Sequence, residues 1–309
     1  MLHHINKLIV LLFISVISLF GFEYKLEPKK VSENVWCFFG KLEMPTKANG
    51  GNMSNNCYVK TKDSYVLIDS GATFKFAKTA YEEMSKIEEL SVSLVINTHE
   101  HDDHWLGNSF YKDTFNAKII GVGLQNKNYK EGDKTRMHHL LAPETLKGTR
   151  IVTVDEVVKN VMTITVGDEE FTLIPVGTTA HSPDDIFVYM PKRKVLFSGD
   201  IVMNGRITSN RDGSVIGQLK ALDMVNNKKW NTLVPGHGYD TSKTATNEFV
   251  KYFTLLKKRV LEAVENDVGA GSVTTVVKLE EFKGKPLYDE LNSKNIFDAY
   301  RELEFYEEE

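Results

Sequence analysis

The pattern of apolar and polar positions predicts a chain of short strands and amphipathic helices. The run Leu90–Asn97 is largely apolar, which is typical of a strand buried within a sheet. The segment Phe74–Ile87 differs, because Phe76, Ala80 and Met84 recur at helical spacing and so predict a helix with one buried stripe. The combination favours a layered α/β fold.

The same reasoning covers the rest of the chain, and its second half is rich in strands. Further strands are expected at Val31–Gly40, Cys57–Lys60, Tyr65–Ile68, Ala117–Val122, Ile151–Val154, Val161–Val166, Glu170–Pro175, Asp185–Met190, Lys194–Ser198 and Thr232–Val234. Further helices are expected to open at Trp105–Tyr111, to form in pieces over Leu124–Lys147, and to cover Gln218–Asn226, Thr244–Val264 and Tyr288–Tyr306.

Two of these strands end in similar residues. Tyr65–Gly71 reads as a strand followed by Asp, Ser and Gly, and Lys194–Asp200 reads as a strand followed by Ser, Gly and Asp. Each half of the chain thus places a carboxylate at the tip of a strand. This echo predicts two strand–helix halves that form one continuous domain and share one site.

A dense group of ligand-type side chains follows the strand at Leu90–Asn97. His99, His101, Asp103 and His104 occur in the order His-x-His-x-Asp-His. Neutral imidazole and carboxylate suit zinc or a similar divalent transition metal. Alternate side chains of an extended segment share a face, so His99 and His101 are expected to bind one ion. Asp103 and His104 lie where the chain turns into a helix and are expected to face a second ion, whereas the alternative is a His-rich surface loop.

Three more ligand-type residues follow predicted strands. They are His181, Asp200 and His237, the last between two glycines in Pro-Gly-His-Gly. Taken singly, each histidine has the alternative of a hydrogen-bonded loop residue, and Asp200 that of a helix N-cap. Together they predict a two-metal site. His138 and His139 have no ligand partner in the sequence, so a solvated helix face is expected, with the substrate entrance as the alternative.

Composition and charge narrow the class of protein. The chain has 309 residues, of which 41% are hydrophobic and 26% charged, which is typical of a globular protein. Its formal net charge of -4 offers no basic surface for nucleic acid. The charge thus counts against a nucleic-acid partner, and the expected partner is a small-molecule substrate.

The N-terminus is expected to be separate from the fold. Lys7 precedes Leu8–Phe22, a segment that is apolar apart from Ser15, Ser18 and Gly21. This length fits a secretory signal at residues 1–22 and falls short of a membrane span of roughly 20 apolar residues. Residues 23–309 would then form the mature, exported protein, with a bacterial periplasm as its expected location. An uncleaved membrane anchor is the alternative.

The chain has two cysteines, Cys37 and Cys57, each in a short strand-like run. If these runs pair, an oxidising compartment allows a disulfide between them. Two buried free thiols are the alternative, and the sequence does not decide between the two.

The run HEHDDH at residues 99–104, followed in order by His181, Asp200 and His237, resembles the metallo-β-lactamase-fold superfamily over about Val31 to Gly238. The resemblance implies a four-layer αββα sandwich with the site at one edge of the two sheets. It implies that His99, His101 and His181 hold one metal and that Asp103, His104 and His237 hold the other. Asp200 would bridge the two metals. Asp69 would act from behind the ligands by fixing the His-rich loop.

Within the superfamily, the loop Phe39–Asn52 and the segment Asp212–Gly213–Ser214 resemble one branch. It comprises exported zinc metallohydrolases found beside bacterial sulfur-oxidation and quinoprotein systems. The chain departs from the superfamily where Asp184 stands in place of a frequent Gly, and Asp185 is expected to take the polar role beside His181. Asp at position 200 resembles the thioesterase and lactonase branches.

The expected activity is hydrolysis by two zinc ions per chain. A hydroxide shared by the metals would attack an ester, thioester, lactone or amide carbonyl, and Asp103 would orient it. The alternatives are an iron-dependent sulfur dioxygenase on the same fold, a class B β-lactamase proper, and a metal-loaded binding protein without turnover. The substrate and the oligomeric state are not encoded in any pattern that we recognise, although Leu42–Asn55 and Leu124–Thr149 are expected to line the pocket.

Overall fold

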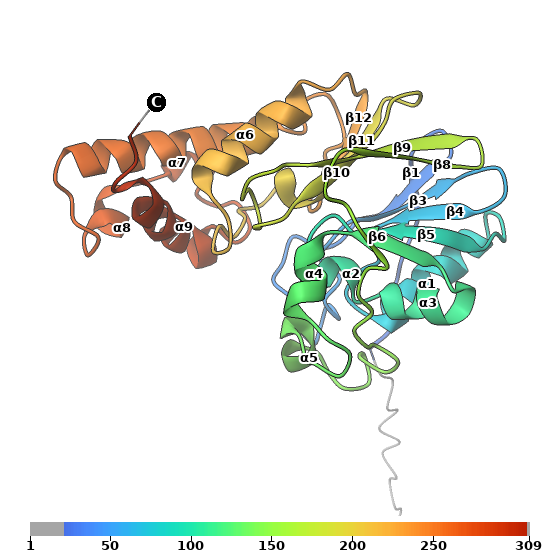
Figure 1. The fold of residues 1–309 in the computed structure, drawn as a ribbon. Coiled ribbons are helices and arrows are strands. Elements are labelled where there is room, and N and C mark those ends of the chain that lie inside the picture. The colour runs from blue at the N-terminus through green and yellow to red at the C-terminus, as the bar shows by residue number, and fades with distance from the viewer. Residues whose placement is uncertain (1–21, 308–309) are drawn as a thin grey trace, which may run out of the picture.

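The computed structural model describes residues 22–307 as two facing β-sheets with helices on their outer sides (Figure 1). The predicted signal segment falls almost wholly outside the described residues. No helix in the described part of the chain is long and apolar enough to cross a membrane.

The first sheet has seven strands in sequence order, β1 to β7. Its first four strands are joined antiparallel, and β4 to β7 run parallel. Their bounds are β1 Lys29–Ser32, β2 Val35–Phe38, β3 Asn56–Lys60, β4 Tyr65–Ile68, β5 Val92–Ile96, β6 Lys118–Gly121 and β7 Glu156–Val157.

The second sheet has five strands in the order β12-β11-β10-β9-β8. The pair β11 and β12 is parallel and the other pairs are antiparallel. The carboxyl ends of β11 and β12 therefore lie side by side. Their bounds are β8 Met162–Val166, β9 Glu169–Pro175, β10 Ile186–Met190, β11 Val195–Phe197 and β12 Thr232–Val234.

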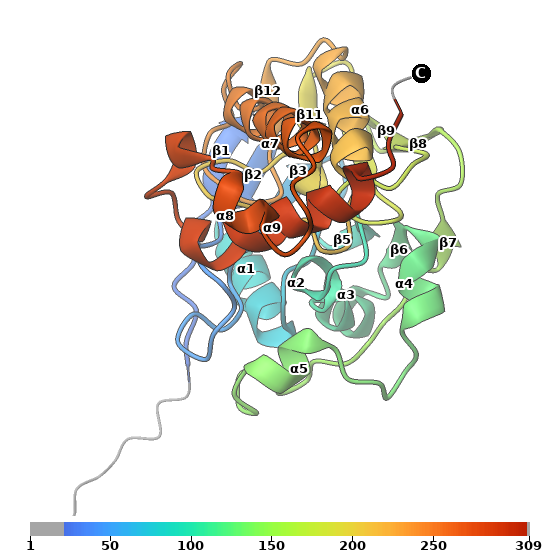
Figure 2. The same ribbon diagram turned by 90° about the vertical axis from the view of Figure 1, so that its left-hand side faces the viewer.

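Helices pack on the outer face of each sheet, and Figure 2 looks onto α7, α8 and α9, which gather at one side of the molecule. The α-helices are α1 Phe74–Ser85, α2 Asp102–Trp105, α3 Asn108–Phe115, α4 Gly123–Asn128, α5 Arg136–Leu140, α6 Val215–Asn226, α7 Asn247–Glu265, α8 Val273–Val276 and α9 Tyr288–Leu303. Two short 3-10 helices are η1 Gly199–Ile201 and η2 Glu280–Phe282.

Three apolar layers hold the sandwich together. Val66 and Ile96 of the first sheet meet Phe171 and Val188 of the second in the central layer. A second layer joins the first sheet to α1 and α3, and a third joins the second sheet to α6, α7 and α9. Burial of apolar surface in these layers is the main force that holds the sheets face to face. The predicted four-layer αββα architecture is therefore confirmed.

Two strand predictions were wrong. Val31–Gly40 was predicted as one strand, but the chain turns at Asn34, which has a φ of 58°, and forms the hairpin β1–β2. Ile151–Val154 is buried but forms no strand. The amide side chain of Asn126 pairs with both backbone groups of Val154, so side chains replace the ladder of a neighbouring strand.

The structure pairs the two cysteines. Cys37 on β2 and Cys57 on β3 lie directly opposite in register, and their sulfurs form a disulfide. Of the two states that the sequence left open, the structure thus contains the disulfide.

Candidate metal centre

The His-rich motif lies at the carboxyl end of β5, as predicted. His99 lies in the loop after the strand and is fully buried, and His101 is the N-cap of α2. Asp103 and His104 belong to α2 itself, so the helix begins earlier than the expected start at Trp105. The four side chains therefore come from the loop after β5 and from the start of α2.

The second sheet delivers the other three side chains. His181 comes from the β9–β10 connection, Asp200 from η1 just after β11, and His237 from the loop just after β12. A Cβ at Gly236 would lie 1.9 Å from Asp200 Oδ1, so only glycine lets the two parallel strand ends approach this closely.

All seven predicted side chains meet at one place. They form two groups, each with its candidate ligand atoms within 4.8 Å of one another: His99, His101, His181 and Asp200, and Asp103, His104 and His237. Asp200 lies between the groups, because its Oδ2 is 3.2 Å from His181 Nε2 and its Oδ1 is 3.2 Å from His104 Nε2. The division of these side chains between two metals and the bridging role of Asp200 stay predictions.

Three buried atoms of the cluster make no hydrogen bond in the structure. They are His99 Nε2, Asp103 Oδ2 and Asp200 Oδ1. Buried polar atoms in proteins are nearly always paired, because leaving one unpaired costs about 1–3 kcal/mol. Orphaned imidazole and carboxylate atoms that converge on one point fit a divalent cation.

The electrostatics of the cluster also suit a cation. Burial lowers the pKa of His181 to about 3 and lowers that of His99, so both rings are neutral at pH 7 and free to act as ligands. Burial opposes the charged form of His104, but the carboxylates of Asp200, Asp69 and Asp103 raise its pKa well above its usual value. The carboxylates thus create a strongly negative site that a positive charge would neutralise.

Asp69 contacts the candidate ligands from outside the cluster. Its Oδ1 accepts a hydrogen bond from the backbone N–H of Thr98 at 2.9 Å, and its Oδ2 contacts Thr98 Oγ1 at 2.8 Å and His104 Nδ1 at 2.8 Å. Asp69 follows β4 with a φ of 55°, a left-handed conformation that is uncommon outside glycine. His237 is oriented similarly, with its Nδ1 2.6 Å from the carbonyl of Met53.

Several residues that shape the site were missed at the sequence level. Arg136 Nη2 donates to Asp102 Oδ1 at 2.9 Å and to Asp103 Oδ1 at 2.8 Å, which leaves Asp103 Oδ2 facing the cluster. Asp212 Oδ2 lies 3.1 Å from His101 Nε2. Arg206 lines the same cavity. Arg136 and Arg206 stand in no ligand-type spacing, and the segment Asp212–Gly213–Ser214 was noted only for its resemblance to one branch, so the sequence did not place these side chains at the site.

The structure also places three other residues that the sequence analysis named. His138 is half-buried and its Nδ1 accepts a hydrogen bond from the backbone N–H of Thr135, which caps its own helix, while His139 is exposed. Asp185 is buried and accepts hydrogen bonds from the backbone N–H and the hydroxyl of Ser182, the residue after His181. Burial raises the pKa of Asp185 to about 7.

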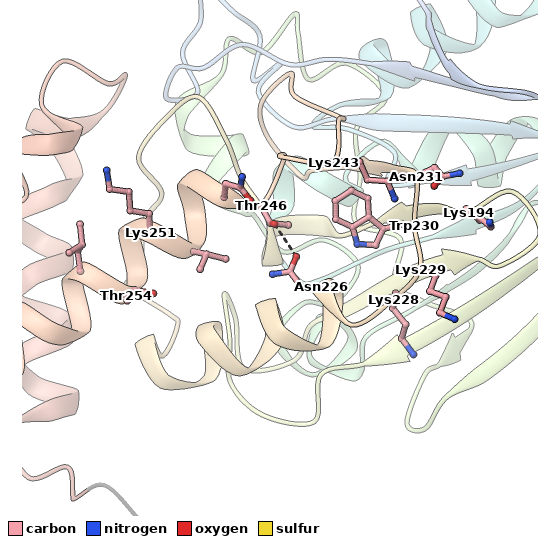
Figure 3. A pocket seen from close by; sticks show the side chains of 13 residues that line it. Lys194, Asn226, Lys228, Lys229, Trp230, Asn231, Lys243, Thr246, Lys251 and Thr254 are labelled. Carbon is pink, nitrogen blue, oxygen red and sulfur yellow. Dashed lines mark hydrogen bonds between the residues drawn. The ribbon is translucent and has the colours of Figure 1, made fainter.

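The cluster opens into a small cavity of about 140 Å³. Met44, Met53 and Arg136 come from the two predicted pocket segments, whereas Leu291 and Lys294 come from α9, which was not expected to contribute. A larger hollow of about 770 Å³ lies elsewhere, between α6, α7 and the amino ends of β11 and β12 (Figure 3). We call it the lysine pocket, after Lys194, Lys228, Lys229, Lys243 and Lys251 in its lining, which includes no histidine or carboxylate.

Comparison with known proteins places this geometry in a family. The model of the Metallo-beta-lactamase superfamily matches residues 50–237. A probable metallo-hydrolase of Methanocaldococcus jannaschii is 24% identical over 210 residues, which are 63% of this chain and 93% of that protein. The metallo-beta-lactamase IND-1 of Chryseobacterium indologenes is 29% identical over 189 residues, 60% of this chain and 71% of that one.

Solved structures show the same fold. A metallo-beta-lactamase from Pontibacter korlensis superimposes with a TM-score of 0.60 at 20% identity, over 74% of this chain and 99% of that one. The region outside the family match includes α7, α8 and α9. The chain therefore belongs to the metallo-beta-lactamase superfamily, as a metal-dependent hydrolase whose cluster of histidines and aspartates lies at the edge shared by its two sheets.

Proposed function

We propose that this chain is an exported dinuclear zinc hydrolase that cleaves an ester, thioester, lactone or amide bond in a small molecule. The observation that carries the proposal is the pair of adjacent ligand groups with Asp200 between them. His99, His101 and His181 would hold one metal, and Asp103, His104 and His237 the other. When bound, two such ions supply a water of lowered pKa and polarise the carbonyl under attack.

The chain's own residues would then position the reactants. Asp103 has one carboxylate oxygen held by Arg136, which leaves Oδ2 to accept a hydrogen bond from the attacking water and orient it. Asp69 holds the rings of the ligands by fixing Thr98 and His104. The cavity has a volume of about 140 Å³, which suits a small acyl group.

Export is part of the proposal. The Cys37–Cys57 disulfide suits an oxidising compartment, where such bonds persist. The apolar segment Leu8–Phe22 would serve as the secretory signal, and the periplasm would be the destination. We further propose membership of the branch associated with sulfur oxidation and quinoprotein relay systems, on the loop Phe39–Asn52 and the segment Asp212–Gly213–Ser214.

Hydrolysis of a β-lactam is the second candidate, because two of the relatives matched bear the name metallo-beta-lactamase. The bond broken would again be an amide, and only the walls of the cavity separate the two candidates. A chromogenic β-lactam therefore belongs in the substrate panel.

The test is metal analysis of the purified mature protein together with a panel of esters, thioesters, lactones and the chromogenic β-lactam. We expect about two zinc ions per chain and turnover of one class, as a two-metal hydrolase requires. Iron in place of zinc, with oxygen uptake on a persulfide, would contradict the zinc assignment and favour a dioxygenase. Two zinc ions without turnover of any carbonyl compound would contradict the proposed reaction.

A further inference from the structure

The strand β8 forms an open edge of the second sheet. It pairs with β9 on one side, and on its other side it makes no backbone hydrogen bond with any described part of the chain. The strand covers five residues, Met162–Val166, and its register with β9 has no bulge. Alternate backbone groups of an edge strand point away from the sheet, so β8 offers a row of N–H and C=O groups to a further strand.

The other three sheet edges are protected against such pairing. The strand β1 carries Lys29 and Lys30 and has a bulge, and β7 has only two residues. The strand β12 has three residues, and the N–H of Leu233 already donates to the carbonyl of Thr241 at 3.2 Å. Charges, bulges, short strands and covering loops are the usual protections of a sheet edge. The segment Val161–Val166 has none of them and contains no charged residue, proline or glycine.

The side chains of β8 also leave apolar surface uncovered. Met162, Ile164 and Val166 contact the central apolar layer but are only half-buried, whereas Phe171 on β9 is fully buried. A hollow of about 650 Å³ lies between these side chains and the first-sheet strands β5 and β6. Val161, just before β8, is 65% exposed. Apolar surface gathered beside a free strand edge favours contact with another chain.

The residue pattern of β8 is complementary to itself. In an antiparallel pair of two β8 strands centred on Ile164, Thr163 of each copy lies opposite Thr165 of the other. Met162 of each copy then lies opposite Val166 of the other. Pairs of threonines and pairs of apolar side chains across neighbouring strands stabilise a sheet. A two-fold dimer joins one patch to its own copy in this way.

The charges that flank β8 favour the same arrangement. Lys159 precedes the strand and Asp168 follows it, and both are exposed. Neither side chain makes an ion pair among the described residues. Antiparallel pairing brings the Lys159 end of each copy to the Asp168 end of the other, so opposite charges meet at both ends of the interface. A parallel pair would bring like charges together.

We propose that this chain forms a two-fold symmetric dimer in which the β8 strands of two copies pair antiparallel and join their second sheets into one continuous sheet. The strand β8 lies at the opposite side of the second sheet from β11 and β12, which precede Asp200 and His237. The dimer therefore leaves the metal cavity open, and the inference does not depend on the proposed reaction.

A matched pair of variants tests both the surface and the register. Thr163→Lys combined with Thr165→Lys places like charges opposite each other twice and should weaken dimerisation by roughly tenfold or more. Thr163→Glu combined with Thr165→Lys places opposite charges there and should restore dimerisation to the wild-type strength. Both positions are exposed, and the two variants differ only at position 163. Sedimentation velocity of the mature, metal-loaded protein over a wide concentration range measures the dissociation constants.

A control separates the β8 edge from the total charge of the protein. Thr254→Lys combined with Thr275→Lys adds the same charge at exposed positions on α7 and α8 and should leave the dimer intact. A wild type that stays monomeric at every concentration would overturn the inference, as would a dimer that both variants retain equally. Dissociation by the two lysine substitutions without recovery in the Thr163→Glu, Thr165→Lys variant would contradict the antiparallel pairing.

Discussion

The metal cavity and the lysine pocket lie at opposite ends of the same two strands. Asp200 and His237 follow the carboxyl ends of β11 and β12, whereas Lys194 and Asn231 precede their amino ends. The lysine pocket is the larger, at about 770 Å³ against about 140 Å³. Its lysines are mostly exposed to solvent, whereas the histidines and aspartates of the metal cavity are mostly buried.

The contrast shows that the free-energy cost of burying polar side chains indicates a functional site better than the volume of a cavity does. Solvated lysines cost the fold almost nothing, and Lys243 is further stabilised by its position 4.9 Å above the ring of Trp230. Buried carboxylates and imidazoles with unpaired atoms destabilise a fold, so they are typically found at functional sites. The parallel strands also direct both ligand-bearing loops to one edge, where sites in α/β proteins commonly lie.

The largest effect is expected from removing a ligand of the metal cavity. His101→Ala and Asp103→Ala should each abolish turnover, a greater loss than the roughly 10–100-fold that follows removal of a group behind a ligand. Both variants should retain the wild-type circular dichroism spectrum. The matched change in the lysine pocket, Lys229→Gln, should leave kcat/KM unchanged. Comparable losses in the two cavities would contradict the difference between them.

A smaller effect is expected from Asp69, which holds Thr98 and His104 without entering the cluster's ligand groups. Asp69→Asn loses the charge that orients the His104 ring, so zinc affinity should fall by roughly 10–100-fold. Competition with a zinc chelator measures this change directly. An affinity equal to that of the wild type would show that the ligand ring is positioned by other contacts.

The smallest effect concerns pH and the metal-free protein. His181 has a pKa of about 3 when folded and about 6.5 as a free side chain, so the unfolded chain binds more protons between these values. Its contribution to stability is therefore complete above pH 6.5 and is lost as the pH falls towards 3. On acidification from pH 7 to pH 5, the wild type should lose more thermal stability than His181→Gln. The exposed His139→Gln variant is the control, and equal losses in wild type and His181→Gln would contradict the assignment.

The sequence alone determined the fold class and identified the seven candidate ligand residues. His99, His101, Asp103 and His104 are close in the chain, so their spacing carries the signal by itself. His181, Asp200 and His237 were found because each follows an apolar run that ends at a sheet edge. Such patterns can be recognised in the sequence because strand periodicity and ligand chemistry both depend on residues that are close together in the chain.

The tertiary structure decided what no local pattern could state. The Cys37–Cys57 disulfide required the register of β2 against β3, and the side chain of Asn126 replaced a strand partner at Val154. Leu291 and Lys294 line the metal cavity although they are distant in the chain from its histidines, because the packing of α9 places them there. Burial and pairing are properties of the folded molecule, since they depend on which distant groups exclude water from a side chain.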